Sequence, residues 1–463
     1  MALVLFVQAK NIYPQLLLGR LLFSIGGSAV STMVTAVLPA VTRKTFEGEA
    51  RQESTEGTTH HDDSRLGQGD PNESHSPSSR LAGFAGMFAG CGALVSLAVF
   101  LPLPGRFQKS GISPAQALQY SYYIVAIVAV LVSIWCFIGL RNLPGEERKG
   151  WRSLLFVSRH SQDPSNAYAN SSSLSPHMPY WKQAGIALAL GFRNSSIGLG
   201  YLGGLVARAS SVGISLFIPL FVNSYYRASG LCEGNPNTEP GGIGDIKRSC
   251  SRAYILASIL TGVSQLVALI AAPAFGFLSE KSRRYHLPLL FATLSGIAGY
   301  IAFALLPSPQ FKGEDGNPGV FVIMALIGIS QIGAIVCSLA ILSNGILSIS
   351  ARDEFLKQIY SSEASHEANH SHQDDGDVTE QQPLLDTQPQ HQNLHQLSHL
   401  KGSIAGVYSL FGGAGILFLT KVGGLLFDVL SPGAPFYIMA GFNGVLCLAV
   451  FVSGLLSKPS FVL

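Results

Sequence analysis

Long apolar stretches, each about the length of a membrane crossing, alternate with polar connections along most of this chain. The clearest stretch, residues 122–140, contains no Asp, Glu, Lys or Arg. A helix needs about 20 mostly apolar residues to cross the hydrocarbon core of a bilayer, and it satisfies its own backbone hydrogen bonds there. The pattern therefore predicts an all-α polytopic membrane protein with nine full spans, over residues 14–41, 81–103, 120–140, 200–222, 253–278, 287–306, 319–347, 402–427 and 434–457.

Two polar segments interrupt this pattern. Residues 46–80 are rich in Ser, Gly, His and Asp, and residues 350–401 are rich in Gln and His. Such compositions are typical of disordered loops. The second segment contains Glu380, Leu384 and Leu385 in the spacing of an acidic dileucine sorting motif, which predicts a sorting adaptor as a partner. Chance occurrence of a short pattern is the alternative.

Composition supports the membrane assignment and excludes other classes. The 463 residues are 48% hydrophobic and 12% charged, against about 25% charged in a typical soluble domain. The net charge of +3 without a basic block argues against nucleic-acid binding. The absence of a His-Glu-x-x-His or Cys-x-x-Cys motif leads us to expect no enzyme activity, metal or cofactor. Cys232 and Cys250 share one polar loop and can pair only in an oxidising compartment.

The distribution of Lys and Arg predicts the orientation of the spans. Cytosolic loops carry an excess of these residues. The excess here lies in the loops after the first, third, fifth and seventh spans, with Arg43, Lys44, Arg51, Arg141, Arg148, Lys149, Arg152, Lys281, Arg283, Arg284, Arg352, Lys357 and Lys401. We therefore expect those loops in the cytosol.

The second and eighth spans resemble each other. Residues 81–95 and 404–418 share matching Ala, Gly and Phe positions six spans apart. A shared Gly and Ala bias in packed helices is the alternative. A parallel six-helix repeat is found in two-lobed transporters. It predicts the last three helices of an N-terminal lobe over residues 1–140, a central cytosolic linker over 141–199, a complete six-helix C-terminal lobe over 200–457 and a tail over 458–463. Residues 1–8 would then be the end of a further helix, and about three helices of the first lobe would be lacking.

Two short motifs resemble those of the major facilitator superfamily. Residues 276–284 (GFLSEKSRR) resemble its cytoplasmic signature loop, Gly-x-x-x-Asp-Arg-x-Gly-Arg-Arg, with Glu280 in place of Asp, Lys281 in place of Arg and Arg283 in place of the second Gly. Residues 19–27 (GRLLFSIGG) resemble its Arg-then-glycines motif. The resemblance implies a two-lobed helical bundle. The long loops and residues 206–223 are similar to fungal vacuolar members, which implies a vacuolar or lysosomal membrane in preference to the plasma membrane.

The loop between the fifth and sixth spans has a physical role independent of the resemblance. Gly276, Glu280, Lys281 and Arg284 place an acid and cations at a helix end. Such groups make charge-assisted hydrogen bonds to a neighbouring helix end. We expect this loop to act as a cytoplasmic gate that latches one arrangement of the lobes. Ordinary positive-inside charge is the alternative.

Two arginines lie within predicted spans. Arg20 and Arg208 each carry a charge that is costly in the membrane interior. Each arginine therefore either marks a substrate or coupling pathway or extends its side chain to the nearer interface. The central parts of the spans contain no Asp or Glu, so proton coupling through a carboxylate has no visible candidate.

Other polar residues in the spans have two interpretations each. Gln265 and Gln331 either bind a polar solute or form interhelical hydrogen bonds. Tyr408 either lines a central cavity or packs between helices. Lys421 and Asp428 are seven residues apart on one helix face, which favours a structural ion pair.

Together these features predict secondary active transport of a small polar solute, with protons as a candidate coupling ion, by alternating access. A non-transporting receptor or regulator that kept the fold, or a fragment of a transporter, is the alternative. The lipid bilayer and a small-molecule solute are the expected partners.

Overall fold

The computed structural model describes residues 17–56, 77–100, 102–139, 180–230, 251–281, 286–312, 316–370 and 401–456. Within these ranges nine helical segments are long and apolar enough to cross a membrane. They are Leu17–Leu38, Ser79–Phe100, Gln116–Gly139, Ser195–Ala228, Arg252–Lys281, Leu287–Ala304, Gly319–Ile349, Lys401–Val429 and Ala434–Leu455. They coincide in order with the nine predicted spans, which confirms the all-α polytopic fold.

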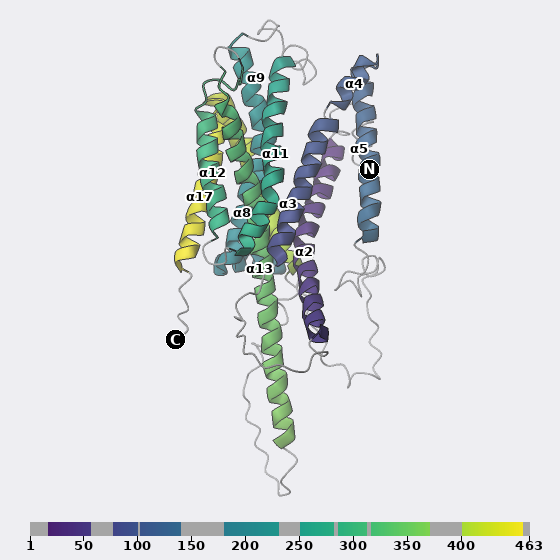
Figure 1. The fold of residues 1–463 in the computed structure, drawn as a ribbon, viewed down its shortest axis with the longest axis vertical. Coiled ribbons are helices and arrows are strands. Elements are labelled where there is room, and N and C mark those ends of the chain that lie inside the picture. Colours follow the sequence, from purple (N-terminus) through teal and green to yellow (C-terminus); the bar gives the residue numbers. More distant parts are fainter. Residues whose placement is uncertain are drawn as a thin grey trace.

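The N-terminal group of helices precedes residue 140. It comprises α2 (Leu17–Glu56), α3 (Pro77–Val95) with a π-helical end at Ser96–Phe100, α4 (Leu103–Lys109) and α5 (Pro114–Gly139). α3 packs against α11 and α13, and α2 packs against α15 and α13. α5 stands to one side with α4 beside it, and its apolar surface is exposed along the span (Figure 1).

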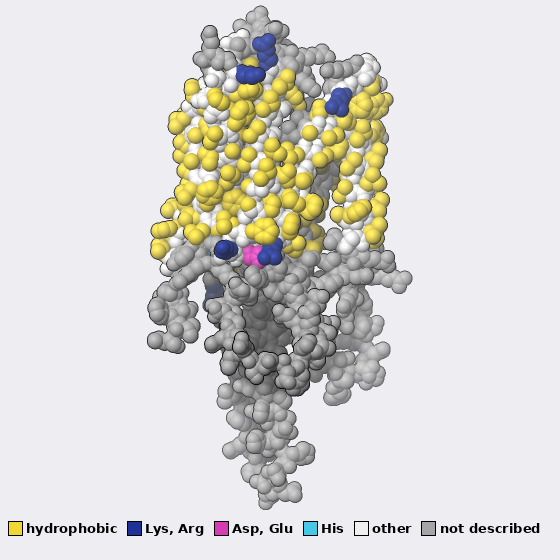
Figure 2. Space-filling view, in the orientation of Figure 1, with side chains coloured by type: hydrophobic (Ala, Val, Ile, Leu, Met, Phe, Trp, Pro, Cys, Tyr) yellow, Lys and Arg dark blue, Asp and Glu magenta, His cyan; other side chains and the backbone are white. Residues whose placement is uncertain are grey.

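The C-terminal group forms the six-span bundle that we call the C-terminal lobe. Its elements are α7 (Tyr180–Arg193), α8 (Ser195–Val212), a π-helical segment (Gly213–Phe217), α9 (Ile218–Ala228), α11 (Ser251–Lys281), α12 (Leu287–Ala304), α13 (Gly319–His370), α15 (Lys401–Phe418), a second π-helical segment (Leu419–Gly423), α16 (Gly424–Val429) and α17 (Ala434–Leu456). Charged side chains gather at the two ends of its apolar band (Figure 2).

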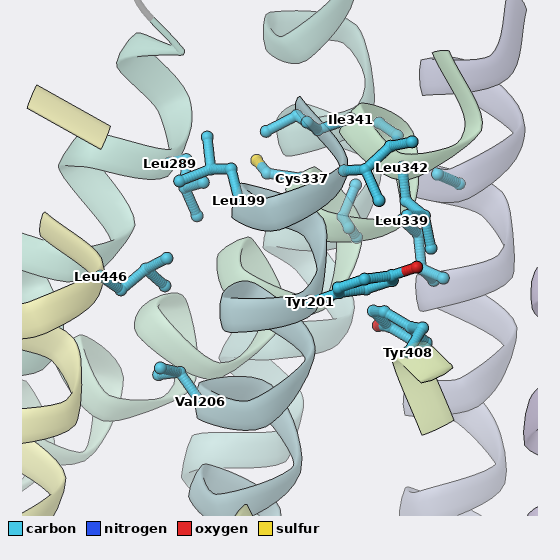
Figure 3. Packing of buried hydrophobic residues seen from close by; sticks show 14 of the residues in the cluster. Leu199, Tyr201, Val206, Leu289, Cys337, Leu339, Ile341, Leu342, Tyr408 and Leu446 are labelled. Atoms are coloured by element: carbon cyan, nitrogen blue, oxygen red, sulfur yellow. The ribbon is translucent and has the colours of Figure 1, made fainter. Parts of the chain in front are cut away.

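Two hydrophobic clusters hold the C-terminal lobe together. One joins α8, α11, α13, α15 and α17, and Figure 3 shows Tyr201 and Tyr408 in it. The other lies toward the α9 end of the lobe. There the ring centroids of the buried Phe303 and Phe436 lie 4.7 Å apart in an edge-to-face contact. Because lipid tails are as apolar as these side chains, close packing is a main source of association between such helices.

Helices extend into three segments that the sequence did not assign to spans. α13 continues as helix through His370, and α2 continues through Glu56, so parts of the segments predicted as disordered loops are helical. Residues 351–369 contain three Ala, three Glu and one each of Arg, Leu, Lys and Gln, and these residue types favour helix even where the sequence is polar. The predicted linker over 141–199 contains α7 and the start of α8.

His286 precedes α12 in a left-handed backbone conformation, with φ 44° and ψ 37°. A β-carbon makes this conformation unfavourable by about 1–2 kcal/mol, and glycine avoids the cost but loses more entropy on folding. We expect His286→Gly to raise the free energy of unfolding by about 0.5–1 kcal/mol in detergent melts. His286→Ala keeps the β-carbon and should not stabilise. A lower melting temperature for the glycine variant would contradict this.

Candidate functional site

Arg208 lies deep within the span formed by α8 and α9. α8 begins at Ser195, where the Asn194 side chain accepts hydrogen bonds from the amides of Ser196 and Ile197. Arg208 follows about 20 Å along the helix axis. Its Nη2 atom donates a hydrogen bond to the hydroxyl of Ser31 on α2. The guanidinium therefore reaches across to the N-terminal helices and does not lie at either end of the span.

Room for the Arg208 side chain is provided by α15. A β-carbon added at Gly412 would lie 2.8 Å from Cγ of Arg208, so only glycine fits there without a shift. One turn earlier, the ring of Tyr408 packs against Gly204. The Tyr408 hydroxyl lies 3.3 Å from the hydroxyl of Ser338 on α13, and the side chain is buried. This placement favours helix packing for Tyr408 over the lining of a cavity.

A second polar contact joins α2 to the C-terminal lobe beside the first. The hydroxyl oxygens of Thr32 and of Ser409 on α15 lie 2.9 Å apart and form a hydrogen bond. Consecutive residues of α2, Ser31 and Thr32, therefore bond to two different helices of the other group. Ser31, Thr32 and Ser409 were not predicted from the sequence. Two adjacent hydroxyl residues in an apolar span were the only available indication.

A chain of hydrogen bonds starts one turn from Arg208. Ser211 is three residues further along α8, so it shares a face with Arg208. Gln331 on α13 donates to the Ser211 hydroxyl at 3.2 Å, and Gln265 on α11 donates to the Gln331 carbonyl oxygen at 3.1 Å. The two glutamines selected from the sequence thus bond to each other, which favours their interpretation as interhelical hydrogen-bonding residues. Together with Ser211 they connect α8, α11 and α13 near the level of Arg208.

The two groups of helices also meet at the end of the bundle where α3 begins and α11 ends. We call this the Glu280 end, and it is the end predicted to face the cytosol. Nε of Arg80 lies 2.5 Å from Oε2 of the buried Glu280. The Arg80 guanidinium also lies over the Phe277 ring at 5.7 Å. Figure 2 shows an acidic side chain beside basic ones at the lower edge of the apolar band. Sequence reasoning selected Glu280 but missed Arg80.

Close backbone packing accompanies this ion pair. A β-carbon added at Gly276 would lie 2.9 Å from the Cα atom of Gly83. α3 and α11 therefore cross in contact at two glycines, one turn from the Arg80–Glu280 pair. Gly276 was predicted to belong to the gating loop. Glycine is required at this position because the backbone of α3 lies too close to leave room for a β-carbon.

The remaining predicted residues lie elsewhere. Arg20 is exposed near the start of α2, and Lys281 is exposed at the end of α11. Lys421 and Asp428 are both exposed, and no ion pair joins them in the part of the chain that the structure describes. The π-helical turn at Leu419–Gly423 changes the helical register between them. Outside the described residues lie Arg284, Cys232, Cys250, Glu380, Leu384 and Leu385.

The polar groups that the described residues bring together form hydrogen bonds between helices and no metal centre. Among the residues described, no group of three or more His, Cys, Asp or Glu side chains could hold a metal ion. Within the described ranges, the nine helices long enough to span a membrane, the two helix groups joined by polar contacts at mid-span and by an ion pair at one end, and the arginine within a span are features of a multi-pass membrane transporter.

Comparison with known families supports the same class. Residues 1–162 match the family model described as vacuole effluxer Atg22 like. This match confirms the resemblance to vacuolar-type transporters of the major facilitator superfamily. It covers α2, α3 and α5 but not the C-terminal lobe that carries Arg208. No curated protein matches the chain.

Proposed function

We propose that this protein moves a small polar solute across the vacuolar or lysosomal membrane by alternating access of its two helix groups. The single observation that carries the proposal is the hydrogen bond between Arg208 and Ser31. A charge in a membrane interior is costly and marks a solute pathway when it faces another helix group. Here it lies at the junction of the two groups that would have to move.

Arg208 and its neighbours supply the groups that would bind the solute. The guanidinium has several N–H donors and suits an anionic or hydrogen-bond-accepting group. A solute of this kind would replace Ser31 as the partner of Arg208. Gln331, Gln265 and Ser211 provide amide and hydroxyl groups within the same layer of the lobe.

The contacts at the Glu280 end suit a gate. The Arg80–Glu280 pair and the Gly83–Gly276 crossing hold α3 against α11 in the arrangement that we describe. Opening this end would break one ion pair and separate one helix crossing. The cost is recovered if contacts form at the opposite end, as rocking of two bundles about a central site requires.

Two further indications support the proposed direction and membrane. The matched family model is described as an effluxer of the vacuole, which supports export from that compartment. The motif formed by Glu380, Leu384 and Leu385 supports sorting to it.

Solute exchange in vesicles tests this proposal. The purified full chain, reconstituted in lipid vesicles, is loaded with unlabelled solutes and supplied with labelled ones, with and without a pH gradient. We expect saturable exchange of one solute class that is absent from protein-free vesicles. The same class should stabilise the protein, by about 2.7 kcal/mol at 100 times its Kd. Stabilisation by a ligand without any exchange would contradict transport and support the receptor alternative.

A further inference from the structure

α7 lies across the ends of two spans at the Glu280 end of the bundle. It joins α8 through Asn194, and the Tyr201 hydroxyl of α8 donates to the carbonyl oxygen of Ala187 at 3.1 Å. The hydroxyl of Ser403, near the start of α15, donates to Oε1 of Gln183 at 3.4 Å. These contacts fix α7 at the boundary where α8 and α15 enter the membrane.

The two faces of α7 have different surroundings. Ala187 is 0% exposed, and Leu190 packs against the core of the C-terminal lobe. The opposite face carries Phe192 and Trp181, each 84% exposed, and Leu188, 37% exposed. Spacings of four and seven residues place these three side chains in one row on the helix. α7 therefore presents an apolar face away from the protein core.

Two cations flank this apolar face. Lys182 and Arg193 are exposed and lie on the same side of the row, about 17 Å apart along the helix. α7 contains no Asp or Glu. A helix with an apolar face and a basic flank typically lies in the interface of a membrane, with its aromatic side chains at the headgroup level.

We propose that α7 is an interfacial helix that binds anionic phospholipids of the leaflet at the Glu280 end. Its continuity with α8 holds it at the surface of the bilayer, and its positive charge, with no Asp or Glu within α7 itself, matches negative headgroups. Each cation near such a surface favours binding about fivefold. Lipid bound here would also act on Arg208 and Ser409, because α8 and α15, the helices that α7 joins, carry these two contacts to α2.

Quenching of Trp181 fluorescence by brominated lipids tests the site. Trp135→Phe and Trp151→Phe leave Trp181 as the sole tryptophan of the three. The full chain is reconstituted in phosphatidylcholine vesicles with equal mole fractions of either phosphatidylserine or phosphatidylcholine brominated near the headgroup. We expect quenching by both lipids, and severalfold stronger quenching by phosphatidylserine.

Charge variants separate headgroup binding from simple contact with lipid. Lys182→Gln with Arg193→Gln should remove the preference for phosphatidylserine but keep the quenching. The matched control, Arg227→Gln with Arg252→Gln, neutralises exposed cations at the opposite end and should keep the preference. Equal quenching by the two lipids before charge removal, or no quenching by either because protein covers this face, would overturn the proposal.

A measurement without substitutions guards against misfolded variants. Native mass spectrometry of the unsubstituted chain in detergent, with equal amounts of the two lipids added, should show phosphatidylserine adducts in excess. Equal adducts of both lipids would also overturn the proposal.

Discussion

Replacement of Arg208 by alanine is expected to abolish solute exchange while the protein stays in the membrane at normal abundance. The substitution removes the only charge that joins the two helix groups at mid-span in the described residues, together with its bond to Ser31. A hydrogen bond to a charged group contributes about 1.5–3 kcal/mol, so the rate should fall about 10- to 100-fold or more. Vesicle exchange at fixed solute concentration, normalised to protein content, measures the loss.

Two controls bear on the role of Arg208. Arg208→Lys keeps the charge but loses the planar fork of donors, so it should retain only part of the activity. Arg20→Ala removes a second arginine, exposed on α2, and should leave exchange nearly unchanged. Exchange by Arg208→Ala at the unsubstituted rate would remove this residue from the mechanism.

Gly276→Ala is expected to separate α3 from α11 at the Glu280 end. The new β-carbon would lie 2.9 Å from the Cα of Gly83, and the obstructing atoms belong to backbone that has no rotamer to change. Overpacking of this kind costs about 1–3 kcal/mol. The loss should appear as a lower free energy of unfolding and as weaker pairing of Arg80 with Glu280.

The same helix provides a matched control. A β-carbon at Gly262 meets no atom within 4 Å. Gly262→Ala should therefore be neutral or stabilise α11 by up to about 1 kcal/mol, because alanine favours helix over glycine. Equal melting temperatures for Gly276→Ala and the unsubstituted chain would contradict this prediction, because they would show that α3 and α11 accommodate the added β-carbon without loss of stability.

The spans could be predicted, and Arg208 could be selected as a candidate, because the relevant physics is local. A long stretch without charge is expected to lie in lipid. A cation within such a stretch is energetically costly, so it marks a candidate functional site. Glu280 was also recognisable, since an acid among cations at a helix end is unusual. These inferences needed no knowledge of which helices are neighbours.

The partners could not be predicted, because they depend on how distant segments pack. Arg80 lies 200 positions from Glu280, in a segment whose polar composition indicated only a loop. Ser31 and Thr32 were equally obscure, since hydroxyls in membrane helices often bond to their own backbone, as Thr32 does to Ser28. The expected pairing of Lys421 with Asp428 assumed a regular helix, which the π-helical turn interrupts.

Reversible cross-linking at the Glu280 end tests alternating access most directly. Arg80→Cys and Glu280→Cys are introduced into a chain whose six native cysteines are replaced, and a short reducible cross-linker joins them. A matched pair within the C-terminal lobe, Ser195→Cys and Ser453→Cys, lies where two hydroxyls touch and should tolerate the same cross-link. We expect that joining residues 80 and 280 stops solute exchange and that reduction of the cross-linker restores it. The protein with the control pair should exchange solute both before and after reduction. Undiminished exchange with residues 80 and 280 joined would contradict alternating access.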